Sequence, residues 1–147
     1  MGQKNRSLSH RIVLDTNCII SALIFSRGKM AWLRHSWQSG AIIPIVSKET
    51  VTELLKVLTY PKFKLTKTEQ SLLLADFLPY AETVTTHEVP MNLPVIRDQA
   101  DQMFITLAVV AKADALVTGD NDLLITKDSF TTPPIMTLSE FQQWKNS

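Results

Sequence analysis

The sequence predicts an α/β fold, a three-layer α/β/α sandwich around a mainly parallel sheet of about five strands. Two observations lead to this prediction. Short β-branched or apolar runs alternate along the chain with longer segments in which apolar residues recur at helical spacing. The chain has 147 residues, a length typical of one domain with a substantial core, and no repeat, low-complexity tract or linker divides it.

The composition is that of an ordinary globular domain, with 45% hydrophobic and 20% charged residues. The 15 Lys and Arg residues almost balance the 14 Asp and Glu residues, which gives a formal net charge of +1. This balance shows no overall basic footprint for a nucleic-acid partner. If the protein binds RNA, its basic residues must therefore be placed locally.

Cysteine content and the polarity of the first residues bear on the compartment and on the domain boundaries. Cys18 is the only cysteine, which excludes an intrachain disulfide and predicts a cytoplasmic protein. Residues 1–10 are polar and are expected to form a disordered tail, followed by a single domain over residues 11–147. The apolar stretch after this tail is interrupted by Asp15 and Asn17 and is shorter than the ~20 residues of a membrane span, so no membrane segment is expected.

The first half of the chain contains two predicted strands and four predicted helices. Runs rich in β-branched residues predict strands over Arg11–Asp15 and Ile42–Val46. Helical spacing, capping residues and helix breakers predict helices from about Asn17 to Gly28, over Met30–Ser39, from Ser47 to Pro61, and from a Thr66–Glu69 capping box to Pro79.

The second half predicts three strands and two helices. A strand is expected over Thr83–Val89, followed by a loop that Pro90 and Pro94 bracket. The remaining elements are expected to be a helix over Gln99–Lys112, a strand over Ala115–Thr118, a strand over Pro134–Met136, and a C-terminal helix after a Thr137–Glu140 capping box.

Four acidic residues stand where a site is expected. Asp15 ends the first predicted strand and Asp120 follows the Ala115–Thr118 strand, and ligands of parallel sheets bind beyond the carboxyl ends of strands. Glu53 lies on a helix and Asp101 lies in the first turn of another. Converging carboxylates repel one another unless a cation binds them, and oxygen-only ligation favours Mg²⁺ or Mn²⁺.

A carboxylate-bound divalent cation can activate a water molecule and stabilise the charge that develops on a phosphodiester. The three histidines, His10, His35 and His87, show neither metal-ligand spacing nor pairing with Cys18. This pattern argues against a zinc hydrolase and against Cys–His catalysis.

Each acid also has an ordinary structural interpretation. Asp15 could cap a helix or form an Asx-turn, and Asp101 would be stabilised by the helix dipole without any metal. Asp120 and Asp122 could be turn residues after Gly119. The four-part pattern, rather than any single acid, favours the functional interpretation.

Three further positions leave alternatives open. Glu49 lies one helical turn before Glu53 and could share its face, and Asp98 fits a helix N-cap better than a metal ligand. The segment Tyr60–Lys64 mixes basic and aromatic residues, which could neutralise and stack single-stranded nucleic acid. The sequence favours an ordinary surface loop for this segment.

Four motifs in order give the chain a resemblance to PIN domains. They are LDTN-x-x-ISAL at residues 14–23, Ser-x₅-Glu-Leu-x₃-Leu at 47–58, RD-x-x-D-x-x-F-x-x-LA at 97–108 and VTGD-x-DLL at 117–124. The chain most resembles the group that contains toxins of toxin–antitoxin pairs, the VapC-type ribonucleases. The resemblance spans about residues 11–144, and four ordered motifs are far more specific than one.

The resemblance implies hydrolysis of single-stranded RNA at a site that depends on Mg²⁺ or Mn²⁺. It assigns the catalytic and metal-binding acids as Asp15, Glu53, Asp101 and Asp120, with Asp122 as a further metal ligand and Asn17 and Thr118 as supporting polar residues. Many relatives carry a second acid just before the third core acid, where this chain has Ala100. This departure puts the detail of metal binding in doubt and leaves the family resemblance intact.

The resemblance also implies partners. A VapC-type toxin would bind a small antitoxin protein, and relatives commonly form homodimers, for which Trp32, Trp37 and Leu72–Leu74 offer apolar surface. The alternative function is a catalytically silent PIN-fold module that binds RNA or protein. The presence of all four core acids argues against lost catalysis.

Two other α/β classes fit less well. A receiver-type signalling domain needs a phosphoacceptor aspartate at the end of its third strand, whereas Glu53 lies on a predicted helix. A sugar-phosphate phosphatase would carry Asp-x-Asp at the first strand, whereas this chain has Asp15-Thr16-Asn17.

Overall fold

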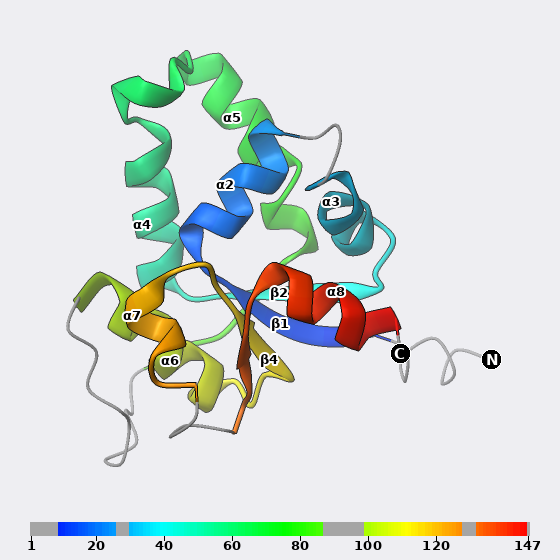
Figure 1. Ribbon diagram of the computed structural model, residues 1–147. Helices are drawn as coiled ribbons and strands as arrows, with labels where there is room; N and C mark the ends of the chain where they lie inside the picture. Colours follow the sequence, from blue (N-terminus) through cyan, green and yellow to red (C-terminus); the bar gives the residue numbers. More distant parts are fainter. Residues whose placement is uncertain (1–8, 26–29, 87–98, 128–131, 147) are drawn as a thin grey trace.

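The computed structural model describes residues 9–25, 30–86, 99–127 and 132–146 (Figure 1). These residues form a five-stranded sheet of order β3-β2-β1-β4-β5, in which every neighbouring pair is parallel. The strands are β1 (His10–Leu14), β2 (Ile42–Val46), β3 (Glu82–Thr83), β4 (Ala115–Val117) and β5 (Ile135–Met136). The predicted parallel sheet of about five strands is confirmed.

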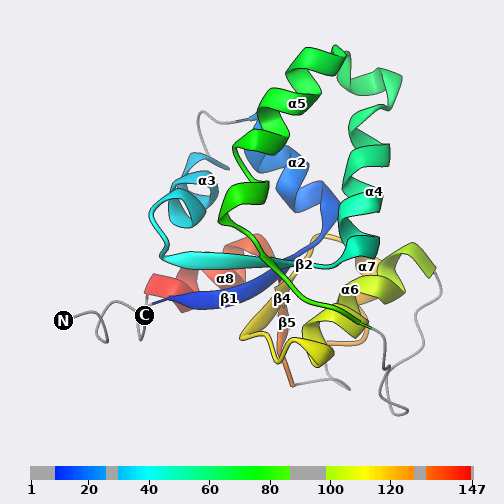
Figure 2. The same ribbon diagram turned by 180° about the vertical axis from the view of Figure 1, so that it is seen from behind.

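Helices pack on both faces of this sheet, as the two opposite views show (Figures 1 and 2). They are α2 (Thr16–Ile24), α3 (Ala31–Gln38), α4 (Lys48–Leu58), α5 (Lys67–Ala75), α6 (Gln99–Val110), α7 (Asn121–Leu124) and α8 (Leu138–Asn146). Two short 3-10 turns, η2 (Pro61–Phe63) and η3 (Leu78–Tyr80), flank α5.

Alternation along β1 divides the core into two layers. Ile12 and Leu14 pack in one cluster with buried residues of α2, α3, α4 and α8. Val13 packs in a second cluster with buried residues of α6 and with Leu123 of α7. Because successive strand side chains point to opposite faces, β1 contacts both helical layers. The predicted three-layer α/β/α sandwich is confirmed.

Side-chain caps begin the helices where the sequence predicts them. In the capping box of α5, the Thr66 amide donates to Glu69 Oε1 at 2.8 Å and the Glu69 amide donates to Thr66 Oγ1 at 3.1 Å. The Thr137 and Glu140 pair makes the same two bonds before α8, at 2.9 and 3.1 Å. Both predicted capping boxes are confirmed.

Several element boundaries differ from the prediction. The strand β3 covers only Glu82–Thr83, so the prediction of a strand over residues 83–89 is wrong for residues 84–86. The helix α6 ends at Val110 rather than Lys112, because Lys112 adopts a left-handed conformation with φ of 53°. The short helix α7 was not predicted.

The expected apolar surface for a homodimer needs a correction at Trp37. This side chain is only 1% exposed, meets Phe77 edge-on at 5.0 Å between ring centroids, and donates its indole N–H to the Asp76 carbonyl. Trp32, Leu73 and Leu74 pack partly buried against the same core. Among the residues predicted to form the homodimer surface, Leu72 is the largely exposed one, at 67%.

Some sequence predictions fall outside the described residues. They include most of the N-terminal tail, the Pro90–Pro94 loop, and the positions of His87, Arg97 and Asp98. At the tail's end, β1 begins at His10, one residue earlier than predicted. Among the described helices, none has both the length and the apolar character needed to cross a membrane.

Candidate functional site

Asp15 is the first of the predicted acids, at the junction between β1 and α2. Its Oδ1 accepts the Cys18 amide at 2.8 Å, which makes Asp15 the N-cap of α2. Its Oδ2 accepts the Thr118 hydroxyl at 2.5 Å and the Gly119 amide at 3.3 Å. The carboxylate is only 4% exposed, so these donors hold it in one orientation at the end of the sheet. The capping and site interpretations of Asp15 are therefore compatible.

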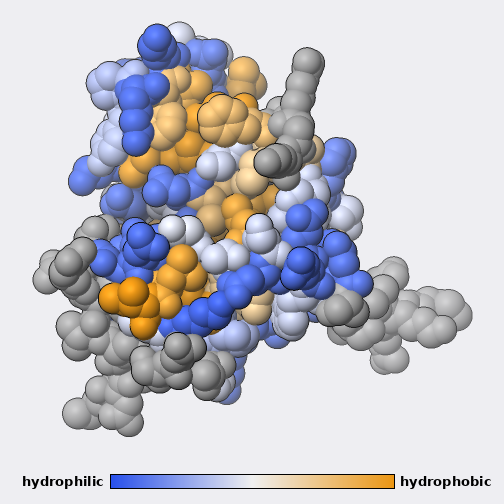
Figure 3. Space-filling view, viewed as in Figure 1, coloured by the Kyte–Doolittle hydropathy of each residue, from blue (hydrophilic) through white to orange (hydrophobic). Residues whose placement is uncertain are grey.

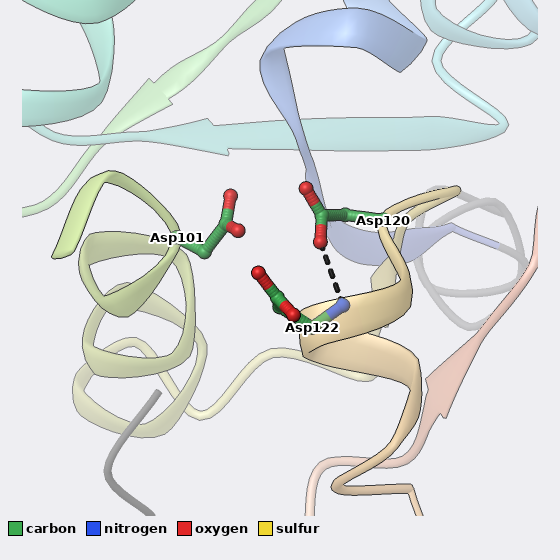
Figure 4. Close-up of side chains that lie close together, drawn as sticks. All are labelled: Asp101, Asp120 and Asp122. Atoms are coloured by element: carbon green, nitrogen blue, oxygen red, sulfur yellow. Dashed lines mark hydrogen bonds between the residues drawn. The ribbon is translucent and has the colours of Figure 1, made fainter. Parts of the chain in front are cut away.

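Asp120 and Asp122 lie at the start of α7, beyond the end of β4. Asp120 caps this helix, because its Oδ1 accepts the Asp122 amide at 2.8 Å (Figure 4). The Asp120 amide in turn donates to Thr118 Oγ1 at 2.9 Å. The turn after Gly119 predicted from the sequence is present. It brings the carboxylates of Asp120 and Asp122 close to each other.

Asp101 approaches these two acids from the first turn of α6, on the other side of the cluster (Figure 4). One carboxylate oxygen from each of Asp101, Asp120 and Asp122 can be chosen so that all three lie within 4.8 Å of one another. Asp101 is 8% exposed, and Asp120 and Asp122 are half-buried. Three carboxyl groups thus converge at the walls of two cavities, where a bound cation would offset their mutual repulsion.

Glu53 joins the site through a cavity of about 260 Å³ that Asp15, Asp101 and Asp120 also line. Glu49, the alternative, is exposed and accepts a hydrogen bond from Thr86 at 3.0 Å. Its own backbone amide and the Thr86 hydroxyl hold the pKa of Glu49 below the usual value. The structure therefore brings Glu53, and not Glu49, to the other acids.

A second cavity, of about 730 Å³, adjoins the first. Both cavities are lined by Asp15, Asn17 and Asp120, and the larger one also contains Asp122. Its other lining residues are partly apolar and include Phe25, Met30 and Leu138. Asn17 is exposed at the shared wall, while Thr118 is buried behind Asp15.

One residue that lines the smaller cavity was missed as a site candidate. Thr16 lines the smaller cavity, and its buried Oγ1 has no hydrogen-bond partner among the described residues. Its place between Asp15 and Asn17 in LDTN was the available signal. Tyr60 and Lys62 also line this cavity, although the sequence favoured a plain surface loop there.

The donor set fits a hard divalent cation. Octahedral Mg²⁺ with bonds of about 2.1 Å separates opposite ligand oxygens by about 4.2 Å, close to the 4.8 Å limit of the carboxylate cluster. Cys18 is unsuited as a thiolate ligand, because burial, and then the neighbouring Asp15, raise the pKa of its thiol well above the usual value. The cluster thus offers carboxylate oxygens, the ligands that hard divalent cations prefer.

Comparison with known proteins agrees with this fold. The chain is 26% identical over 126 residues to uncharacterized protein MJ1680 of Methanocaldococcus jannaschii, covering 86% of this chain and 81% of the relative. Two solved structures share its fold. VapBC2 from Rickettsia felis, bound to a DNA fragment from its promoter, has a TM-score of 0.57 and 18% identity over 86% of this chain and 96% of that one. PAE2754 from Pyrobaculum aerophilum has a TM-score of 0.58 and 14% identity over 93% and 90%.

The family model for the PIN domain matches residues 11–122, which include Asp15, Glu53, Asp101, Asp120 and Asp122. This match covers most of the chain and all the acids that the two cavities bring together. The chain belongs to the PIN domain family.

Proposed function

We propose that this protein is a metal-dependent endoribonuclease that hydrolyses phosphodiester bonds of single-stranded RNA. The observation that carries the proposal is the carboxylate cluster of Asp101, Asp120 and Asp122, within 4.8 Å, beside a cavity that Asp15 and Glu53 line. PIN domains are generally nucleases, and the acidic cluster of this chain is compatible with that activity.

Asp15, Glu53, Asp101 and Asp120 are proposed as catalytic residues that hold Mg²⁺ or Mn²⁺, with Asp122 as a further ligand. When bound, the ion activates water and stabilises the charge that develops on the phosphodiester. Thr118 holds the Asp15 carboxylate, and the cap of α7 holds that of Asp120, so the site is positioned before substrate arrives. Asn17, exposed at both cavities, is placed to orient water or substrate.

The crowded carboxylates also make substrate binding depend on the ion. A phosphodiester carries negative charge, and the acids lining the smaller cavity repel it when no cation is present. Loss of the metal is therefore expected to lower both the affinity for RNA and the rate of cleavage.

The test is a cleavage assay with a labelled, unstructured RNA in Mg²⁺, in Mn²⁺ and in EDTA, with the Asp15→Asn variant alongside. We predict cleavage by the wild type with either metal, none in EDTA, and none by the variant. Asn keeps one acceptor for the Cys18 amide and so still caps α2. Its amide nitrogen would face the Thr118 hydroxyl and the Gly119 amide, which are both donors, so the melting temperature of the folded variant should fall modestly.

Full activity of the Asp15→Asn variant would show that the site is assigned wrongly. Absence of cutting by folded wild-type protein under every condition would favour the alternative, a silent PIN-fold module that binds RNA or protein.

We further propose that the protein is the toxin of a toxin–antitoxin pair, with a small antitoxin protein as partner. The shared fold with VapBC2 and the PIN domain match support this proposal. Growth arrest upon bacterial expression of the wild type, but not of Asp15→Asn, is the corresponding cellular readout. The lone cysteine is consistent with a reducing cytoplasm as the compartment.

We also propose that the protein forms a homodimer. Leu72, exposed on α5, supports an interface on that helix, since large apolar side chains at a surface often mark contacts between chains.

A further inference from the structure

The chain that leaves α4 contributes two side chains to the smaller acidic cavity. Tyr60 and Lys62 line it together with Glu53, Asp101 and Asp120. Tyr60 is the N-cap of η2 and Lys62 lies within η2, so one short segment supplies both a ring and a cation. This combination is the one that binds single-stranded nucleic acids in general, with a base stacked on the ring and a phosphate near the charge.

Lys62 differs in charge from its surroundings. Among the described residues that line either acidic cavity, it is the basic one. Its Nζ lies 5.1 Å from the centroid of the Phe63 ring, and within the described part of the chain it pairs with no carboxylate. The charge of this exposed side chain is therefore available to an anion that enters the cavity.

Tyr60 offers the apolar partner. Its side chain is 37% exposed although large and aromatic, and it stands in the lining of the cavity rather than in the core. An aromatic face of this kind stacks any nucleobase, which adds affinity with little dependence on sequence.

The backbone holds these two residues in place. The Tyr60 amide donates to the Val57 carbonyl at 3.0 Å, and the Phe63 and Lys64 amides donate to the Tyr60 and Pro61 carbonyls at 3.1 Å. Pro61 fixes its own φ angle, and Phe63 packs partly buried against the core. A segment that is already ordered loses little conformational entropy when it binds a ligand.

We infer that Tyr60 and Lys62 form an RNA-binding subsite, in which Tyr60 stacks one nucleobase and Lys62 contacts the phosphate of a neighbouring nucleotide. The inference rests on the proposed function. It also specifies that the RNA strand reaches the acids from the side of Tyr60 and Lys62. Because both cavities share Asp15, Asn17 and Asp120, a strand that enters past Tyr60 continues over the acids into the larger cavity.

The subsite selects single strands. A cavity of about 260 Å³ has no room for a base-paired duplex, and stacking on Tyr60 requires a base free of its helix. Structured RNA is therefore expected to bind more weakly than an unstructured strand of the same length.

The test measures binding separately from cleavage. Fluorescence anisotropy of a short, labelled, unstructured RNA gives Kd across a KCl series with Mg²⁺ present, in the Asp15→Asn background. We expect Lys62→Ala to weaken binding on the order of fivefold at low salt and to reduce the slope of log Kd against log salt by about 0.7, as loss of one single-strand phosphate contact predicts. Tyr60→Ala should weaken binding about tenfold without changing the slope.

Conservative variants and a matched control keep the test specific. Lys62→Arg and Tyr60→Phe should keep near-wild-type affinity, because charge and ring are retained. Lys56→Ala removes the same charge from an exposed position on α4 that lines neither cavity, and should leave Kd almost unchanged. Equal effects of Lys62→Ala and Lys56→Ala would overturn the subsite.

Kinetics in the wild-type background separate this inference from the proposed function. Lys62→Ala and Tyr60→Ala should raise KM for RNA cleavage and leave kcat within about twofold, since neither residue touches the scissile bond. If wild type cleaves RNA while these variants keep its KM, the subsite is refuted and the nuclease stands. If the binding pattern holds while wild type cleaves nothing, the subsite stands and the nuclease proposal fails.

Discussion

Thr118 connects two of the acidic residues through one hydroxyl group. The hydroxyl donates to Asp15 Oδ2 at 2.5 Å and accepts the Asp120 amide at 2.9 Å, and the residue is fully buried. It thereby links the end of β1 to the turn that begins α7. Thr118 is buried and cannot touch substrate, but it holds Asp15 and Asp120, which line the cavities, in fixed positions.

Replacement of this hydroxyl by a methyl group should impair both stability and cleavage. We predict that Thr118→Val lowers the free energy of unfolding by about 1–2 kcal/mol, because a buried donor and acceptor are lost. Cleavage should fall about 10- to 100-fold, the usual effect of removing support from a metal ligand. Urea denaturation and the RNA assay measure the two effects.

Thr118→Ser is the control, since it keeps the hydroxyl and should keep most of the activity. Wild-type cleavage by Thr118→Val would mean that the hydroxyl has no part in the site.

The acids could be found from sequence because each lies beside a recognisable strand or helix signal. The strand ends placed Asp15 and Asp120, and the motif register favoured Glu53 over Glu49, as the cavity lining now does. The sequence raised Tyr60–Lys64 as a possible nucleic-acid contact but favoured a surface loop, because the place of Lys62 in the acidic cavity depends on the fold. The same holds for the unpartnered hydroxyl of Thr16.

At the scale of elements, an ion pair ties the short edge strand β3 to the centre of the sheet. Arg11 donates through Nε to Glu82 Oε1 at 2.9 Å and through a terminal nitrogen to Oε2 at 2.6 Å. This two-point contact holds the pKa of Glu82 below its usual value and raises the pKa of Arg11. The strand β3 has only two residues and so makes few backbone hydrogen bonds to β2. The Arg11–Glu82 ion pair adds a side-chain contact that helps to hold β3 in the sheet.

The Arg11–Glu82 pair should make part of the free energy of unfolding depend on pH. The pKa of Glu82 is lower in the folded state, so its contribution is present above the unfolded value of about 4.3 and is lost as pH falls through the folded value. We predict that Glu82→Gln costs on the order of 0.5 kcal/mol at neutral pH, a small value because both partners are about a third exposed.

Urea denaturation at neutral pH and at about pH 3 provides the comparison. The difference between wild type and Glu82→Gln should shrink at the lower pH. A constant difference at both values would show that the pair does not titrate as described.

The sequence analysis missed the helix α7 and predicted the wrong extent for the strand β3. The helix α7 has four residues, too few for a periodic pattern, and it forms because Asp120 caps it. The strand β3 pairs through two residues with β2, and its extent depends on that partner rather than on its own composition. The long helices and buried strands could be predicted because each buries apolar residues at a regular spacing, which is visible in the sequence.

At the scale of the whole molecule, apolar side chains reach the surface in more than one place. On the face drawn in Figure 3 they gather in the upper half, over α5 and α2, and again at the lower left, near α7, among hydrophilic ones. Leu72 of α5, at 67% exposure, is part of the exposed apolar surface of the molecule. This residue remains available for the proposed homodimer, whereas Trp37 is not.

We predict that the wild type has twice the 16.5 kDa chain mass in solution and that Leu72→Lys shifts it to the monomer. A charge introduced into an apolar interface must be buried without a partner, which strongly opposes association. Size-exclusion chromatography with light scattering measures the mass. Ser71→Lys introduces the same charge at the adjacent exposed position and serves as the control. A monomeric wild type would contradict the proposed dimer.

If carboxylates from four separate elements form one metal site, calorimetric titration with Mn²⁺ detects it most directly. We predict saturable binding by the wild type, at least tenfold weaker binding by Asp101→Asn, and wild-type binding by Asp114→Asn, which removes a carboxylate outside both cavities. Absence of saturable binding by the wild type, or equal affinity in Asp101→Asn, would contradict it.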